Sequence, residues 1–182
     1  HKEYRRQRQM CIRDRSGSVK GEIIDQICSV LGRWGLKNYR VEFGRETRAQ
    51  GRGRGGKGWI AKLEDEQSSN SGEFERVFLR NYSMATSDTC LSINPITGTS
   101  PKFFKLLDPR TGRPVKHDLI AVHAFAPMAR DADAWATALM VLGPEEGMKI
   151  AEQMDLVVRF CVREGNQTKK TYSQAFRRLF LE

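Results

Sequence analysis

The stretch that decides the fold reads Asp131-Ala-Asp-Ala-Trp-Ala-Thr-Ala-Leu-Met-Val-Leu-Gly-Pro-Glu-Glu-Gly147. It predicts a helix over 129–142, because acidic residues in the first turn suit the positive end of the helix dipole. Gly143 and Pro144 end this helix. Proline also favours the first position of a new helix, so we expect a second helix to start at Pro144, with two glutamates in its first turn.

Asp133 and Thr137 are the residues of this stretch whose spacing points to chemistry. At positions i and i+4 they lie on one face of the predicted helix, one turn apart. Carboxylate and hydroxyl oxygens are hard ligands that suit Mg²⁺, and the alanines around them leave room for a ligand to approach. The spacing alone leaves a second interpretation open, in which Asp133 only favours the helix N-terminus and Thr137 only packs.

The rest of the chain predicts further helices and strands. Apolar residues at helical spacing predict a helix over 20–34 with one buried face, formed by Ile23, Ile24, Ile27, Val30, Leu31 and Trp34. We expect strands at 38–43, 59–63, 74–82, 119–126, 156–164 and 169–172, and turns at 84–88 and 108–112. Because no regular βαβ repeat emerges, the predicted class is α+β.

The composition is that of an ordinary globular protein of 182 residues, with 39% hydrophobic and 29% charged residues. No apolar run approaches the roughly 20 residues that a membrane span requires. The four cysteines are widely spaced and form no C-x-x-C pair, which indicates neither a zinc site nor a disulfide framework. The length suits a single folded domain.

The net charge of +9 raises the question of a nucleic-acid partner. The best candidate surface for one is the basic segment Gly51-Arg-Gly-Arg-Gly-Gly-Lys-Gly58. Binding to single strands also uses aromatic side chains that stack on bases, and none interleaves with these cations. We therefore interpret the segment as a solvated basic loop and expect no nucleic-acid partner.

The first fifteen residues differ from the rest, with six lysines or arginines against two acids. They include Met10-Cys-Ile-Arg-Asp-Arg15, the string obtained by translating a common transposase sequencing adapter. We interpret residues 1–15 as an artefactual or disordered segment, with a natural basic tail as the alternative. Residues 16–182 are then the folded part of the chain.

Four segments, in order along the chain, resemble the motifs of the ApbE family of flavin transferases. Asp131–Gly147 resembles its helix signature, and Asp108-Pro-Arg-Thr-Gly-Arg-Pro-Val115 resembles its D-P-x-T-G-x-P turn. Met84-Ala-Thr-Ser87 resembles (A/S)-T-S-G, and Ser16-Gly-Ser-Val-Lys-Gly-Glu-Ile-Ile-Asp25 resembles D-L-S-G-x-A-K-G-x-x-x-D. The resemblance covers nearly all of residues 16–182. It implies a mixed, largely antiparallel sheet packed with helices, lacking the N-terminal part of the family's domain.

The resemblance also implies the identity of the metal ligands. It assigns Mg²⁺ binding to the side chains of Asp133 and Thr137, and so favours the first of the two interpretations of this pair. A backbone carbonyl of the serine-glycine segment completes the family's site, which points to Gly17.

The flavin contacts follow from the same motifs. The family's lysine-glycine position maps onto Lys20, and the apolar position before the aspartate-proline turn maps onto Leu107. The aspartate that opens the first motif maps onto Asp14. His117 and His123 have no carboxylate or cysteine at ligand spacing, and we interpret both as structural or surface residues.

Several positions depart from the family pattern. Lys105 stands where the family has a histidine, a candidate for proton transfer. A lysine is mostly protonated at neutral pH and is a poor base. Asp88 follows Thr86 and Ser87 where glycine is expected, and Arg45 replaces the second glycine of the family's G-G-(D/E).

The resemblance implies Mg²⁺-dependent transfer of FMN from FAD to a threonine of an acceptor flavoprotein, with release of AMP. The implied cofactor is Mg²⁺, and FAD is the substrate. The family works in the periplasm or anchored to the membrane, and this sequence contains no signal for either. Because the family's N-terminal half is absent, we expect little or no transfer by this chain alone. The alternative function is that of an inactive remnant that binds FAD and Mg²⁺.

Overall fold

The computed structural model describes residues 18–63, 75–88, 106–165 and 167–182. The segment 1–15, with its predicted adapter origin, therefore lies outside the described residues. In chain order the elements are α2 (Val19–Arg33), β1 (Tyr39–Phe43), β2 (Glu46–Gln50), the 3-10 helix η2 (Arg54–Gly56), β3 (Trp59–Leu63), β4 (Glu75–Leu79), β5 (Tyr82–Asp88), β6 (Leu107–Asp108), β7 (Arg113–Pro114), β8 (Leu119–Ala126), α4 (Ala129–Leu142), α5 (Pro144–Gln153), β9 (Val157–Glu164), β10 (Gln167–Tyr172) and α6 (Gln174–Phe180).

The sheets confirm the predicted α+β class. Hydrogen bonds join six strands in the order β1-β2-β5-β8-β9-β10, while β3-β4 and β6-β7 form two-stranded sheets. The pairs β1-β2, β2-β5, β9-β10 and β6-β7 are all antiparallel. None of the described helices is long and apolar enough to cross a membrane.

The predicted strand 119–126 and helix 129–142 coincide with β8 and α4. The turn predicted at 84–88 is wrong, because these residues lie within β5. Thr86, Ser87 and Asp88 have small polar side chains that are typical of turns in an isolated sequence. In the fold the strand is buried from Ser83 to Asp88, and the chain turns earlier, where Asn81 takes a φ of 55°.

The chain divides into two compact units. The first comprises the described parts of His1–Ala61, Phe78–Ala85 and Phe125–Trp135. The second comprises those of Lys62–Val77, Thr86–Ala124 and Ala136–Glu182.

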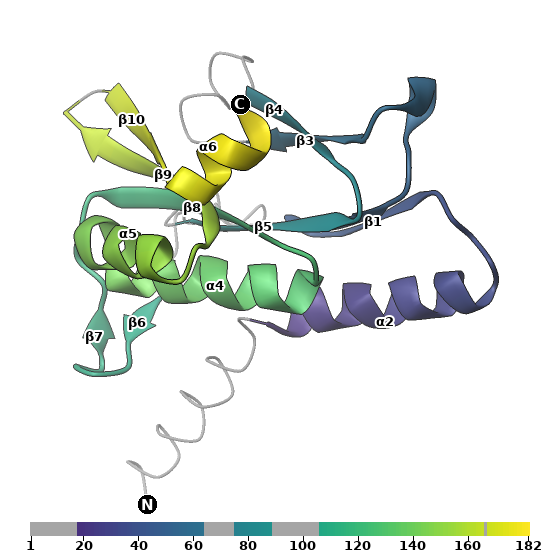
Figure 1. Cartoon of the computed structure of the whole chain (residues 1–182). Coiled ribbons are helices and arrows are strands. Elements are labelled where there is room, and N and C mark those ends of the chain that lie inside the picture. The colour runs from purple at the N-terminus through teal and green to yellow at the C-terminus, as the bar shows by residue number, and fades with distance from the viewer. Residues whose placement is uncertain (1–17, 64–74, 89–105, 166) are drawn as a thin grey trace, which may run out of the picture. The chain divides into compact units, whose positions relative to one another are not determined.

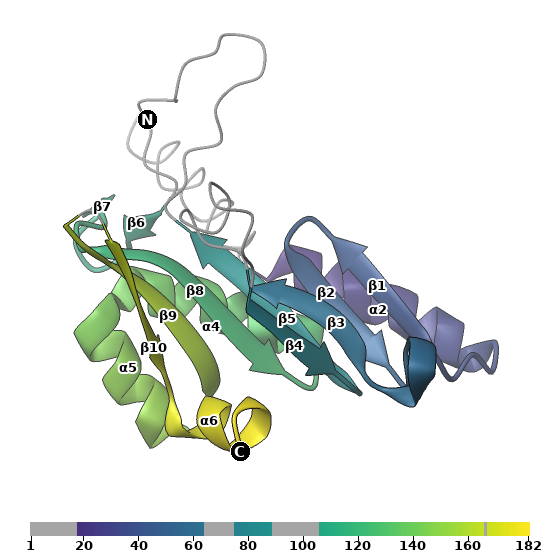
Figure 2. The same ribbon diagram turned by 90° about the horizontal axis from the view of Figure 1, so that it is seen from above.

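In the first unit, β1 and β2 form a tight antiparallel hairpin in which Phe43 pairs with Glu46. The sequence did not predict β2, which pairs with β1, whereas β3 on the other side of the basic loop pairs with β4. Helix α2 packs along this hairpin, as Figures 1 and 2 show. Ile24 and Cys28 of α2 are buried with Ala129 at the start of α4.

The buried face of α2 differs from the predicted one. Ile23, Ile27 and Val30 are 41%, 41% and 36% exposed, and Trp34 is 76% exposed. Ile24 is buried as predicted, but the residues buried with it are Gly21, Asp25 and Cys28. The helix turns this side inward because the backbone at Gly21 lies against the start of α4. A Cβ at Gly21 would lie 2.6 Å from the Cα of Arg130 and would overlap the Ala129 carbonyl.

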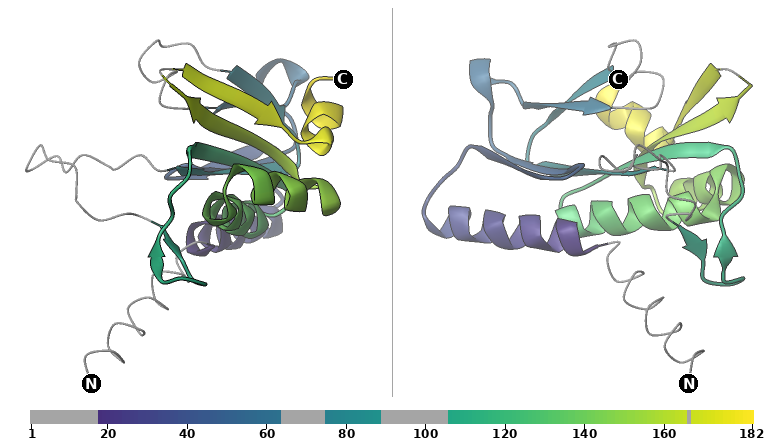
Figure 3. Two further views of the ribbon diagram at one scale, coloured as in Figure 1. Left: turned by 90° about the vertical axis from the view of Figure 1, so that its left-hand side faces the viewer. Right: turned by 180° about the vertical axis from the view of Figure 1, so that it is seen from behind.

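In the second unit, β9 and β10 form a hairpin with Cys161 opposite Lys170, and α5 and α6 pack on β9 (Figure 3). Ser173 begins α6, because its Oγ accepts the N–H of Phe176 at 3.2 Å. Arg159 is fully buried and pairs with Glu75 at 3.0 Å. This unit thus buries a charge together with its partner.

Two glycines of α2 provide a matched test of the close helix contact. Nothing lies within 4 Å of a Cβ at Gly32. Gly32→Ala should therefore raise the free energy of unfolding by up to about 1 kcal/mol through helix propensity. Gly21→Ala should lower it by about 1–3 kcal/mol, because the added methyl group overpacks the contact. Urea unfolding measures both, and equal effects at the two positions would contradict the close contact.

Candidate metal centre

Asp133 lies in the second turn of α4 with only 5% of its surface exposed. Its Oδ2 accepts the backbone N–H of Gly21, the third residue of α2, at 2.9 Å. That N–H precedes the first hydrogen bond within α2, which runs from Glu22 to Ser18. The Ser18 side chain makes no capping bond. Asp133 therefore satisfies a free donor at the N-terminus of another helix.

An ion pair with one buried member is electrostatically coupled to Asp133. The ammonium group of Lys20 pairs with Glu46, whose side chain is 2% exposed. The backbone N–H of Arg45 also donates to Glu46, at 3.0 Å. The side chain of Lys20 is 42% exposed, so its cation remains accessible from solvent. The first unit thus places two buried carboxylates and one accessible cation near each other.

These surroundings disfavour the ionised form of Asp133. Burial raises the pKa of its carboxyl above the ordinary value, and the charge of Glu46 acts in the same direction. The N–H of Gly21 and the charge of Lys20 oppose this rise without cancelling it. A divalent cation at the carboxylate would supply the missing positive charge.

Thr137 follows Asp133 by one turn of the same helix and is half-buried. The pair keeps the predicted spacing, whereas Gly17, the predicted third ligand, lies outside the described residues. The described residues contain no cluster of three histidine, cysteine, aspartate or glutamate side chains able to hold a metal. Mg²⁺ usually binds through one or two carboxylates together with water or substrate phosphate. One carboxylate and one hydroxyl therefore fit Mg²⁺ better than zinc.

Lys20, a predicted flavin contact, lies in the same unit as Asp133, and the two are electrostatically coupled. Leu107, the second predicted contact, lies in the second unit, half-buried in β6 and paired with Pro114 of β7. The predicted turn between these strands is confirmed, since the N–H of Gly112 donates to Asp108 at 2.8 Å. Asp14 and Lys105 lie outside the described residues.

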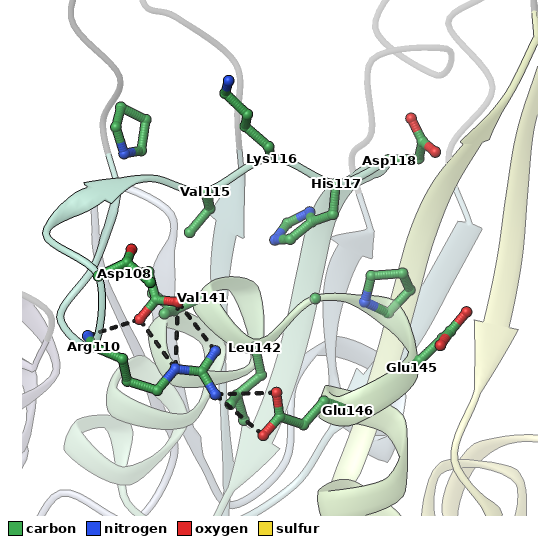
Figure 4. A pocket seen from close by; sticks show the side chains of 14 residues that line it. Asp108, Arg110, Val115, Lys116, His117, Asp118, Val141, Leu142, Glu145 and Glu146 are labelled. Atoms are coloured by element: carbon green, nitrogen blue, oxygen red, sulfur yellow. Dashed lines mark hydrogen bonds and ion pairs between the residues drawn. The ribbon is translucent and has the colours of Figure 1, made fainter.

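The second unit has its own pocket, of about 510 Å³, between this turn and the start of α5. Figure 4 shows the side chain of Arg110 between Asp108 and Glu146, and its guanidinium binds both carboxylates. The Nε2 of His117, on the pocket wall, lies 2.8 Å from the carbonyl oxygen of Met140. The fully buried His123 lies 3.2 Å from Arg159. Both histidines have structural contacts, as predicted.

Residue-by-residue interpretation of the sequence missed two buried charges of the first unit. Glu46 holds Lys20, and Asp25 pairs with Arg48. Asp25 also accepts the backbone N–H groups of Ala129 and Arg130, both at 3.0 Å. Asp25 could have been found from its position in the motif that also contains Lys20 and Gly21, but only the fold shows which groups it binds.

Comparisons with known proteins agree with this arrangement. The sequence pattern of the ApbE family matches residues 2–160. A FAD:protein FMN transferase of Haemophilus influenzae is 33% identical over 91% of this chain and 48% of its own length. The structure of the apo flavinyl transferase ApbE of Pseudomonas stutzeri has a TM-score of 0.78 and 31% identity, over 91% of this chain and 50% of that one. The flavin transferase ApbE of Vibrio cholerae has a TM-score of 0.77 and 29% identity, over 90% and 51%.

The match is to part of each relative. The chain spans about half the length of the curated relatives and solved structures that it resembles. The shared fold confirms the predicted mixed, largely antiparallel sheet packed with helices.

The raised pKa of Asp133 gives a pH test of the metal centre. Its contribution to the free energy of unfolding should be fully present below pH 3.8, the ordinary carboxyl value, and should decline as the pH rises through the raised pKa. Asp133→Asn should remove this decline and make the metal-free protein more stable at pH 7. Denaturant titrations at several pH values measure the difference.

Added Mg²⁺ should stabilise the unmodified chain relative to Asp133→Asn. At about 100 times its dissociation constant, Mg²⁺ should raise the free energy of unfolding of the unmodified chain by about 2.7 kcal/mol. Asp133→Asn should lose this gain, and Asp131→Asn, a matched change at an exposed residue of the same helix, should keep it. Equal stabilisation of all three proteins would exclude Asp133 as a ligand.

Proposed function

The chain belongs to the ApbE family, and we propose that it forms the C-terminal part of an enzyme that transfers FMN from FAD to a threonine of an acceptor protein. We propose further that the transfer requires Mg²⁺ and releases AMP. The observation that carries the proposal is the carboxylate of Asp133, which is 5% exposed and lies one helical turn from Thr137 on the same helix.

The proposed reaction is a phosphoryl transfer. The threonine oxygen of the acceptor forms a bond to the FMN-side phosphorus of FAD, and the bond from that phosphorus to the AMP oxygen breaks. The hydroxyl proton leaves to a base, and AMP departs with the electrons of the broken bond. Bound Mg²⁺ would neutralise charge on the pyrophosphate oxygens.

The chain's own residues have distinct parts in this proposal. The side-chain oxygens of Asp133 and Thr137 hold the metal. Lys20 provides a cation for the phosphates, and its pairing with Glu46 restrains the ammonium group while 42% of the side chain stays exposed. A restrained charge stabilises a developing anion without reorganising during the reaction. Leu107 provides apolar surface for the flavin nucleotide.

A second candidate function is binding of FAD and Mg²⁺ without transfer. Two observations favour it: the chain spans about half the length of its relatives, and Lys105 replaces the family's histidine. A protonated lysine does not accept the proton of the attacking hydroxyl. For the chain alone we expect this outcome.

Two assays separate the candidates. Quenching of FAD fluorescence measures binding, and it should strengthen with Mg²⁺ in both cases. Mass spectrometry of a threonine-containing acceptor peptide measures the added FMN. For the transfer assay, residues 16–182 are joined to the part of the Haemophilus influenzae relative that the match does not cover, since the match covers 48% of that protein.

The chimera should flavinylate the peptide only when FAD and Mg²⁺ are present. Asp133→Asn should reduce the rate by at least about 100-fold, in the range expected when a charge-stabilising group of the transition state is lost. Asp131→Asn should leave the rate within about twofold. Flavin binding without any transfer by the chimera would favour the second candidate, and absence of both would contradict the two proposals.

A further inference from the structure

Helices α2 and α4 cap each other. Asp25 of α2 accepts the N–H groups of Ala129 and Arg130 in the first turn of α4, both at 3.0 Å. Asp133 of α4 accepts the N–H of Gly21 in the first turn of α2 at 2.9 Å. Figures 1 and 3 show the N-terminal ends of the two helices side by side. All these residues belong to the first unit.

Neither helix has an effective cap from its own chain segment. The hydroxyl of Ser18 makes no capping bond to α2. The residue before α4 is Met128, whose thioether is a weak acceptor. The first hydrogen bond within α4 runs from Ala132 to Met128, which leaves the earlier N–H groups without an intrahelical partner. Each helix therefore obtains its cap from an aspartate of the other.

The two caps are arranged alike. Each aspartate stands four residues after the small residue whose N–H is capped, Gly21 before Asp25 and Ala129 before Asp133. One helical turn separates these positions, so each small residue and its following aspartate share a helix face. Only glycine fits at position 21, because a Cβ there would overlap the carbonyl of Ala129. The contact thus fixes the register of one helix against the other.

From this arrangement we infer that Asp25 is a positioning residue for Asp133. The carboxylate of Asp25 holds the first turn of α4 on α2, and so keeps Asp133, one turn further on, against the N–H of Gly21. The Gly21 bond leaves Oδ1 of Asp133 free of that contact and orients it, as hydrogen bonds to metal ligands generally do. The consequence for the metal rests on the proposed function, whereas the coupling of the two caps does not.

Arg48 completes the arrangement from β2. Its guanidinium pairs with Oδ1 of Asp25, the same oxygen that accepts the N–H of Ala129. Arg48 therefore compensates the charge of Asp25, while the two oxygens of Asp25 accept the N–H groups of Ala129 and Arg130. Asparagine at this position would keep one acceptor oxygen and put an NH₂ group in place of the other, so it would lose one cap bond with little change in volume.

The test compares Asp25→Asn with Asp131→Asn in the full 182-residue chain. The control makes the same chemical change in the first turn of α4, at an exposed residue that caps nothing in the described contacts. Amide hydrogen exchange followed by NMR reports on the N–H groups of Ala129, Arg130 and Gly21. Electron paramagnetic resonance of added Mn²⁺, with FAD present, reports on the metal site.

Asp25→Asn should speed exchange at Ala129 or Arg130 about five- to tenfold, as expected when a helix loses a cap. It should also speed exchange at Gly21, to which Asp25 makes no bond. The reciprocal variant Asp133→Ala removes the oxygen that accepts the N–H of Gly21, and it should speed exchange at Ala129 because coupling between two sites is mutual. The control should change none of these rates by more than about twofold.

The dissociation constant of Mn²⁺ should rise at least about tenfold in Asp25→Asn and stay unchanged in the control. Unchanged exchange at Gly21 in Asp25→Asn would overturn the coupling. Faster exchange with unchanged Mn²⁺ affinity would reduce Asp25 to a purely structural cap. If the unmodified chain binds no Mn²⁺, the second candidate function, binding of FAD and Mg²⁺ by this chain, fails, and the exchange rates alone decide whether Asp25 positions Asp133.

Discussion

The crossing of α2 and α4 is the contact on which the first unit depends. Two helix N-termini meet there, and each would leave N–H groups without partners if the other were absent. Asp133 accepts a donor of α2, and Asp25 accepts two donors of α4. Gly21 permits the backbones to approach closely enough for both bonds to form. The same crossing decides which face of α2 is buried, and it leaves Ile23 and Ile27 at the surface.

This arrangement sets Asp133 in an unusual environment. The carboxylate is buried, faces the negative charge of Glu46, and receives only partial compensation from Gly21 and Lys20. Such a group disfavours its own ionised form, and natural proteins keep costly buried charges mainly where function requires them. The proposed divalent cation would offset that cost, because it would add positive charge beside the carboxylate.

Local sequence features predicted the parts of the fold that depend on neighbouring residues. The acidic first turn and the Gly143-Pro144 break located α4 and the start of α5 correctly. Asp133 and Thr137 were identified from spacing and family resemblance. Prediction failed where burial overrides local preference. Thr86, Ser87 and Asp88 lie in a buried strand, and most of the predicted apolar stripe of α2 faces solvent.

By itself the sequence determined the membership of the family, the position of α4 with the start of α5, and the spacing of Asp133 and Thr137 one turn apart on one helix. These features are encoded within a few residues of one another, so short-range patterns suffice to recognise them. Only the tertiary structure decided what Asp25 and Glu46 do. Their partners are separated from them by 104 and 26 residues in the chain. A carboxylate's role depends on the donors that folding brings to it, and no local pattern records which distant donors those are.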